Sequence, residues 1–230
     1  MRLMNFRVRR ATEEDVVGLS DVVAEALATE RLGAWLVSDA AERLDVLRRY
    51  SRFVLTRGLE YGQVDTIDDH AAVTVWFARR EPLPPSAEWA HDLHRLLGAH
   101  AARFALLHSY VDAVVPYIPH HHLAQVAARA GQSVAARALL ASYHRALDAD
   151  GLPAYAEISS DQPQDGLLGR LGYQPRSPIL LDPGGPMIWR MWRPRPGGGQ
   201  FGGLPRRVRL YRTATPFQGQ LIPAAAMRFP

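Results

Sequence analysis

The sequence contains no cysteine and no lysine. The absence of cysteine excludes disulfide frameworks, cysteine-ligated zinc, iron–sulfur clusters and thiol nucleophiles. The absence of lysine excludes mechanisms that use a lysine Schiff base or the lysine of a P-loop. All 27 basic side chains that titrate above neutrality are therefore arginines.

Long apolar segments are also missing. No stretch approaches the roughly 20 apolar residues that a transmembrane helix needs. Residues 1–7 lack the apolar run of a secretory signal. We therefore expect a cytoplasmic protein with no membrane partner.

Acidic residues are absent from the C-terminal part of the chain. Asp182 is the last of them, and residues 183–230 carry eight arginines, whereas residues 1–182 have a net charge of −4. The high isoelectric point, near 9.7, belongs to this tail rather than to the body of the protein. We consequently do not expect a nucleic acid as a partner of the body.

Hydrophobic periodicity predicts a mixed α/β domain. Strands are expected at 6–11, 63–67, 72–77, 120–128, 154–158, 178–181 and 187–192, and helices at 12–27, 38–59, 86–107, 132–150 and 164–171. Glycines and prolines then dominate, and 197–203 has the composition of a flexible linker. We expect one domain over 1–194 and a Gly/Pro/Arg-rich extension over 195–230, in which 208–212 is a further strand candidate.

The candidate chemical groups lie on two of these strands. His120 and His122 point to the same face of their strand, whereas His121 points to the other. Histidine titrates near neutrality and can deprotonate an ammonium group.

Glu157 lies in the middle of a buried strand, where a carboxylate needs a partner and can act as a base or an amine anchor. We take His120, His122 and Glu157 as the catalytic candidates. Packed or surface histidines and an arginine-paired structural carboxylate are the alternatives. No local motif supplies a metal site.

The order of four segments from His120 to Trp192 resembles the GNAT superfamily of CoA-dependent N-acyltransferases. These segments are the strand HHHLAQVAA (120–128), the loop and helix GQSVAARALL (131–140), the strand DGLPAYAEISS (150–160) and the helix LLGRLGY (167–173). The resemblance implies a GNAT-like mixed central sheet flanked by helices. It also implies that the first strand separates from its neighbour to admit the pantetheine arm of acetyl-CoA or another acyl-CoA.

The resemblance also implies which residues hold the cofactor. A helix N-terminus presents free N–H groups and a positive dipole end, which suits a diphosphate. The implied cofactor-binding residues are Val126, Ala128, Gly131, Gln132, Ser133, Val134, Ala135, Ala136 and Gln164. The resemblance further implies that backbone N–H groups near Val126 stabilise the oxyanion.

Three positions, Gly131, Val134 and Leu168, depart from the family pattern. The family motif has Arg or Gln at its first defined position, Gly three residues later, and Gly or Ala two residues after that. Gly131, Val134 and Ala136 align with these three positions in order, so only Ala136 conforms. Leu168 occupies the place of a tyrosine that protonates the leaving thiolate in many members.

The resemblance implies acyl transfer, with acetyl as the first choice, from acyl-CoA to an amine of a small molecule. A homodimer is one expected state, because dimers are common in the family. Two alternatives stay open. One is a repurposed enzyme of specialised metabolism that performs a cyclisation or decarboxylation. The other is a non-catalytic binding protein that keeps only the fold.

Overall fold

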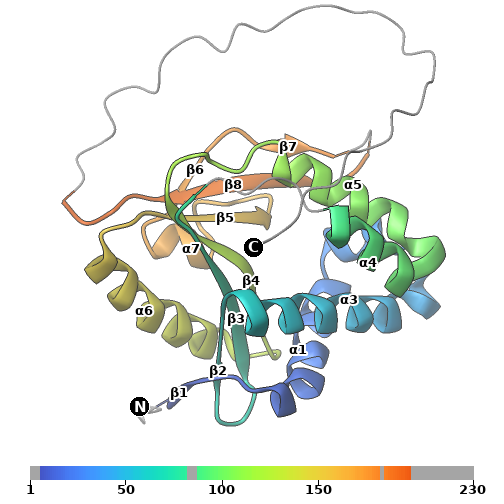
Figure 1. Cartoon of the computed structure of the whole chain (residues 1–230), viewed down its shortest axis with the longest axis horizontal. Helices are drawn as coiled ribbons and strands as arrows, with labels where there is room; N and C mark the ends of the chain where they lie inside the picture. The colour runs from blue at the N-terminus through green and yellow to red at the C-terminus, as the bar shows by residue number, and fades with distance from the viewer. Residues whose placement is uncertain (1–5, 82–86, 182–183, 198–230) are drawn as a thin grey trace, which may run out of the picture.

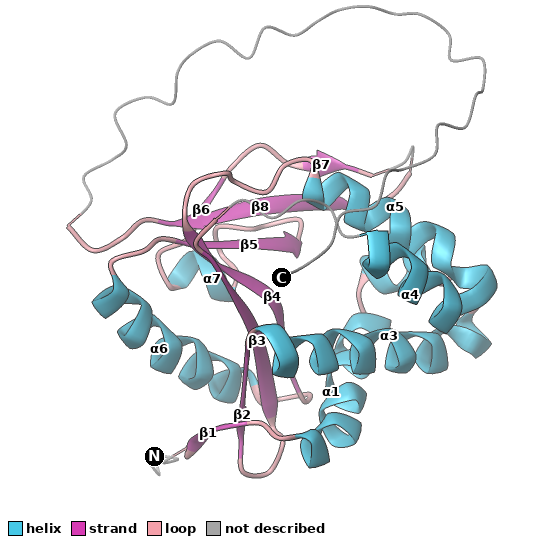
Figure 2. Ribbon diagram, viewed as in Figure 1, coloured by secondary structure: helices cyan, strands magenta, loops and turns pink. Residues whose placement is uncertain are grey.

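The computed structural model describes residues 6–81, 87–181 and 184–197. They form one mixed sheet with helices on both of its faces (Figure 1, Figure 2), which confirms the expected fold class. The strands are β1 (Val8–Arg10), β2 (Gln63–Ile67), β3 (Ala72–Arg79), β4 (His120–Ala128), β5 (Ala154–Ser159), β6 (Gln174–Pro175), β7 (Ile179–Leu180) and β8 (Met187–Arg193).

The strand order across the sheet is β1-β2-β3-β4-β5-β8-β6, and β7 pairs with the other end of β8. β4 and β5 pair in parallel, whereas the other pairs are antiparallel. A parallel pair needs a long crossover, and a helix provides it here. β4 was predicted with the bounds that the structure gives it, and the following helix ends at Gly151, which has a φ of 71°. Glycine is the residue that adopts this left-handed conformation most easily at a helix end.

Helical segments surround the sheet on both sides. They are η1 (Glu13–Asp15), α1 (Val16–Ala28), α2 (Arg31–Leu36), α3 (Ala40–Tyr61), α4 (Ala87–Leu97), η2 (Gly98–His100), α5 (Ala101–Asp112) and α6 (Ser133–Asp150); the short α7 (Leu167–Arg170) follows β5. In Figure 1, α6 lies on one side of β3 and β4, and α1, α3, α4 and α5 lie on the other side.

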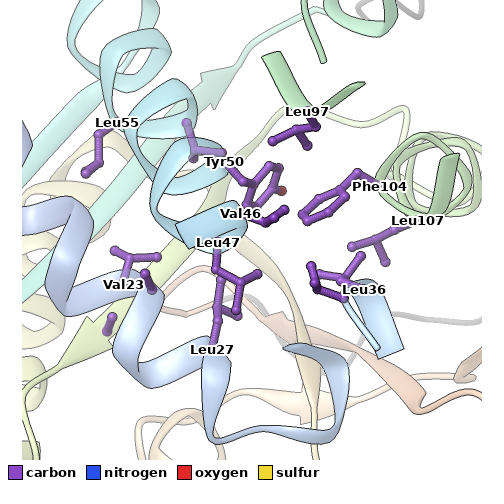
Figure 3. Close-up of a cluster of buried hydrophobic side chains, with 14 of the residues drawn as sticks. Val23, Leu27, Leu36, Val46, Leu47, Tyr50, Leu55, Leu97, Phe104 and Leu107 are labelled. Atoms are coloured by element: carbon purple, nitrogen blue, oxygen red, sulfur yellow. The ribbon is translucent and has the colours of Figure 1, made fainter. Parts of the chain in front are cut away.

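The larger hydrophobic core lies on the side of α1 to α5. Figure 3 shows side chains from α1, α2, α3, α4 and α5 meeting there, with Tyr50 and Phe104 facing each other. The ring centroids of these two residues are 4.7 Å apart. α4 and α5 therefore belong to the same hydrophobic core as α3. In the sequence they form an insertion between the neighbouring strands β3 and β4.

A second core lies on the side of α6 and α7. Trp76 of β3 stacks on Tyr143 of α6 with ring centroids 4.0 Å apart and planes within 4° of parallel. Leu123, Leu168 and Met191 belong to the same cluster. Such stacking contributes free energy beyond the area that it buries, so it fixes α6 against the sheet.

Local structure differs from the sequence prediction at several places, one of which is β6, whose two residues were not predicted as a strand. α2 was not predicted, because its six residues are too few to show helical periodicity. The single helix expected over 86–107 is interrupted at Gly98, which adopts a φ of 53°, and it resumes as α5. The helix expected from Gln164 starts at Leu167, since 163–165 form a turn.

Several sequence expectations fall beyond these ranges. The strand candidate at 208–212 and most of the extension at 195–230 lie outside the described residues. Among the helices of the described ranges, none combines the length and the apolar character needed to cross a membrane.

Candidate active site

The central feature of the site is the point where β4 and β5 separate. Their parallel register runs from His121 opposite Ala154 to Leu123 opposite Ala156, and within the described residues it does not continue further. On its other edge β4 stays paired with β3 as far as Ala128. Backbone groups of β4 beyond Leu123 that face β5 therefore have no strand partner on that edge, in the part of the chain that the structure describes.

A β-bulge lies at the same place. Val75 pairs with Gln125 and Trp76 pairs with Leu123, so Ala124 is the extra residue of β4. A bulge bends its strand, increases the local twist and redirects side chains. It explains why β4 turns away from β5 directly after Leu123.

The three consecutive histidines of β4 divide between the two faces, as predicted. His121 lies on the α6 side, where its Nε2 is 2.9 Å from Asp150 and its Nδ1 is 2.9 Å from the Tyr143 hydroxyl. A carboxylate can only accept, so Nε2 carries the proton and Nδ1 accepts from tyrosine. Both nitrogens of His121 are therefore used in structural hydrogen bonds.

His120 and His122 lie together on the opposite face, with ring centroids 6.3 Å apart. His120 donates from Nδ1 to the Ile118 carbonyl at 2.7 Å, and His122 donates from Nε2 to Glu157 at 2.8 Å. These acceptors fix the tautomers. Nε2 of His120 and Nδ1 of His122 consequently carry lone pairs, and neither has a hydrogen-bond partner among the described residues.

Glu157 reaches this face from β5. Its side chain is 11% exposed and that of His122 is 9% exposed. Oε1 of Glu157 is buried without a hydrogen-bond partner in the described part of the chain. The hydroxyl of Tyr155, two residues earlier on the same face, is also buried and unpaired there. Burial first, and then the nearby Glu157 carboxylate, raise the pKa of Tyr155, which is therefore a neutral donor.

Charged groups of β3 and α5 surround this pair. Burial lowers the pKa of Arg79 and raises that of Asp112, and each of these groups interacts electrostatically with Glu157. Burial also lowers the pKa of His108 to about 4 and that of His120 to about 4. Both histidines are thus neutral at pH 7. The helices inserted between β3 and β4 bring His108 and Asp112 to the site.

Unsatisfied polar atoms concentrate at this surface. Buried polar groups in native proteins nearly always have partners, so each exception needs a reason. Here Arg79, His120, His122, Tyr155 and Glu157 each have a buried polar atom that is unpaired among the described residues. Most of these atoms are acceptors. A ligand or water that donates hydrogen bonds would give these acceptors the partners that they lack.

The other face of the sheet carries a second feature at the N-terminus of α6. A cavity of about 350 Å³ is lined by Ser133, Val134, Arg137, Leu167 and Arg170. The first N–H groups of a helix have no partner within it, and no acidic residue lines this cavity. Helix N-terminus and arginines together form a positively charged pocket that suits an anion.

The predicted cofactor residues divide into two groups around α6. Ser133 and Val134 line the cavity, and Gly131 precedes them with a φ of 78°. Ala135 and Ala136 are buried against the sheet instead. Their small side chains allow α6 to approach the sheet closely. Gln132 is the N-cap residue, and its N–H donates to the Arg129 carbonyl.

The remaining predicted residues lie around the strand opening. Val126 lies on the α6 side. It packs against the cluster around Trp76 and against a further cluster that includes Ile67 and Leu139. Ala128 ends β4. Gln164 is exposed in the turn before α7 and is not part of the cavity lining. Leu168 is only 3% exposed and packs in the core with Tyr173. The sequence analysis missed Arg137 and Arg170. One signal was available for Arg137, which lies one helical turn after Ser133.

Metal binding finds no support in these side chains. Among residues 6–81, 87–181 and 184–197, no three histidine or carboxylate groups are placed to hold a metal ion together.

Comparison with known proteins gives structural relatives only. No protein-family model matches the sequence, and no curated protein matches it. An acetyltransferase related to histone acetyltransferase from Corynebacterium glutamicum is 25% identical with a TM-score of 0.59, and the match covers 84% of this chain and 97% of that one. An arylalkylamine N-acetyltransferase from Aedes aegypti has a TM-score of 0.56 at 11% identity, over 82% and 98% of the two chains. An agmatine N-acetyltransferase has a TM-score of 0.55 at 16% identity, with the same coverage.

These relatives share the fold described above, a mixed sheet flanked by helices. The chain therefore has the GNAT fold of these acetyltransferases.

Proposed function

We propose that the protein transfers an acyl group, acetyl being the first candidate, from acyl-CoA to a small-molecule amine. The observation that carries this proposal is the position of the His122–Glu157 pair beside the opening between β4 and β5. The anion-binding cavity lies at the other side of the sheet. An acyl donor held in that cavity and an amine held by the pair would meet at the opening.

The residues present fit an acyl-CoA. Ser133 and Val134 offer backbone N–H groups, and Arg137 and Arg170 offer charge for the phosphates. Val134 is 60% exposed, so its side chain can lie beside a ligand without displacing the core. The unpaired edge of β4 beyond Leu123 suits the amides of a pantetheine arm. When bound, acyl-CoA supplies a thioester whose carbonyl carbon the amine attacks, so that a C–N bond forms and the C–S bond breaks.

The side-chain chemistry at the pair suits amine activation. The lone pair on Nδ1 of His122 accepts a proton from the incoming ammonium or from the attacking amine. Glu157 then stabilises the imidazolium through the Nε2–H hydrogen bond, as a carboxylate does in other histidine bases. His120, which burial keeps neutral, offers a second acceptor. We assign His122 as the base, Glu157 as its positioning residue and His120 as an amine contact.

Stabilisation of the oxyanion and of the leaving group falls to different atoms. We assign the oxyanion to backbone N–H groups of β4 between the bulge at Ala124 and Val126, where this strand leaves β5. Leu168 has no proton to give, so the thiolate leaves without a side-chain acid at that position. A thiolate is a stable leaving group near neutral pH, since a free thiol has a pKa of about 8.5.

The acceptor class is supported by the hydrogen-bonding character of the site. His120, His122 and Glu157 present acceptors, and an amine or ammonium group presents donors. Two of the structural neighbours are named for amine acceptors, an arylalkylamine and agmatine. A small-molecule amine thus fits both the side chains of the site and the names of these neighbours.

The test combines binding and turnover. Calorimetry with acetyl-CoA should give saturable binding, which weakens in an Arg137→Ala, Arg170→Ala double variant. An amine screen can then follow release of free CoA with a thiol reagent, and the absence of cysteine gives this assay no background from the protein. Absence of binding at millimolar acetyl-CoA would contradict the proposal and favour a repurposed or non-catalytic fold.

A further inference from the structure

A second, smaller cavity lies on the face of the sheet that carries His122 and Glu157. Its volume is about 110 Å³, and its lining comes from the junction of α1 and α2, the end of β5 and the start of β8. The lining residues are Glu30, Arg31, Ser159, Ser160, Asp161, Pro186 and Met187. It is separate from the anion-binding cavity beside α6.

The register of β5 and β8 places this cavity in line with the catalytic pair. Glu157 lies opposite Arg190 and Ser159 lies opposite Ile188, whose side chain belongs to the core on the α1–α5 side. Residues two apart on a strand share a face and lie about 6.6–7 Å apart. Glu157 and Ser159 therefore lie on one face, and the cavity begins one strand repeat beyond the pair.

The charges in the cavity are unbalanced. Nη1 of Arg31 is 3.5 Å from Oδ1 of Asp161, so these two groups compensate each other. Glu30 is exposed at the cavity and has no ion pair or side-chain hydrogen bond among the described residues. The cavity therefore carries one uncompensated carboxylate. The hydroxyl of Ser159 on its floor can accept a further hydrogen bond.

The volume sets the size of a suitable group. A water molecule occupies about 30 Å³ in the liquid, so the cavity holds a group of about three or four non-hydrogen atoms. An ammonium or a guanidinium head fits this limit, whereas an aromatic ring does not.

We propose that the acceptor is dibasic, with one amine held at the His122–Glu157 pair and a second cationic group held by Glu30 in this cavity. This inference rests on the proposed function, since it assumes that the pair receives an amine. Ser159 in the cavity lining lies one strand repeat, about 6.6–7 Å, beyond Glu157. We therefore expect the best acceptors to have an alkyl chain of about four to six carbons between the cations.

The experiment compares α,ω-diamines of three to eight carbons with monoamines of equal length. We expect kcat/KM to be at least about fivefold higher for the diamines of four to six carbons than for their monoamine partners. Glu30→Gln should bring that ratio close to one. The matched control is Glu25→Gln, because Glu25 is an exposed carboxylate on α1 that does not line the cavity. Equal kcat/KM values for diamines and monoamines in the wild type would overturn the inference, and so would a preference that survives Glu30→Gln.

A binding measurement separates this inference from the proposed function. Calorimetry with 1,5-diaminopentane and with pentylamine, with and without CoA, measures the affinity of the cavity for a second cation and does not depend on turnover. Tighter binding of the diamine that is lost in Glu30→Gln would support the cation site even in a protein that acylates no amine. Monoamine turnover without any diamine preference would leave acyl transfer intact and refute the cation site.

Discussion

Nε2 of His122 and Oε2 of Glu157 are 2.8 Å apart, although the two residues are 35 positions apart in the sequence. Glu157 lies two residues beyond the strand partner of His122, which is Tyr155. The bond therefore crosses the sheet diagonally, at the last point where β4 and β5 are still held together. It joins His122, the proposed base, to the strand whose separation from β4 forms the candidate site.

Replacing Glu157 with glutamine tests the role of this bond. In the Glu157→Gln variant the amide keeps an oxygen that can accept from His122 but lacks the negative charge that stabilises the imidazolium. We expect kcat to fall about 100-fold or more, with a smaller change in the KM of acetyl-CoA. Steady-state rates of thiol release measure both constants. Glu14→Gln, at an exposed carboxylate, is the control, and wild-type kcat in Glu157→Gln would refute the assignment.

Arginine replacement tests the cavity beside α6. Arg137→Ala and Arg170→Ala should each raise the KM of acetyl-CoA about fivefold to tenfold, because each removes one cation from the phosphate site. Added salt should reduce the difference in the KM of acetyl-CoA between wild type and variants, since salt screens exposed charges. Arg145→Ala is a matched control, as Arg145 is exposed on the same helix but outside the cavity lining. A KM that is unaffected in both variants would place the phosphates elsewhere.

Introducing a tyrosine at position 168 should not raise the rate of the proposed acyl transfer. Leu168 is buried in a packed core, and its carbonyl accepts the N–H of Tyr173. A larger, polar side chain in this place costs about 1–3 kcal/mol of folding free energy. We expect Leu168→Tyr to lower the melting temperature without raising kcat, as measured by thermal unfolding and thiol release. Higher kcat at unchanged stability would show that the family's proton donor can be restored here.

Acid should destabilise the fold through His144. Its Nε2 forms a hydrogen bond with the Tyr173 hydroxyl at 3.0 Å, and burial lowers its pKa to about 4. The unfolded chain takes up a proton at this histidine near pH 6.5 and the folded chain only near pH 4. This contribution to stability is therefore complete above about pH 6.5 and is lost as the pH falls toward 4, by at most about 1.4 kcal/mol per pH unit.

Urea unfolding between pH 7 and pH 5 measures this dependence. His144→Gln should lose stability at pH 7 but show a shallower slope with pH than wild type, because glutamine does not titrate. Tyr173→Phe is the control, since it removes the hydrogen bond and keeps the imidazole. If the unfolding free energy of His144→Gln changed with pH as steeply as that of wild type, His144 would not be the group that titrates between folded and unfolded states.

Sequence patterns predicted the parts of this fold whose signal is local. β4 is an example, because nine residues of extended pattern follow Pro119 and precede Gly131, which lies just before the start of α6. α6 is another, because its apolar spacing and Gly151 mark both its length and its end. The division of His120 and His122 from His121 followed from the two-residue period of a strand.

Other features depend on contacts between distant segments and could not be predicted. The pairing of His122 with Glu157 requires the β4–β5 register, which no local pattern contains. Asp112 and His108 reach the site only because α5 packs over α3. The side chains that line the two cavities come together only once α7 has folded beside α6 and the end of β5 lies beside Glu30.

The short β4–β5 register is where the two halves of the sheet meet. One half holds β1 to β4, and the other holds β5 to β8. At this seam three residue pairs join them, and the backbone groups of β4 beyond Leu123 have no strand partner on the edge that faces β5, so we expect their amides to exchange more readily than those paired with β3. A ligand that fills the seam would supply the missing hydrogen bonds and act as a cross-link between the halves. Amide exchange of residues 124–128 should therefore slow most when that ligand binds, and the protein would reach its full rigidity only in the complex.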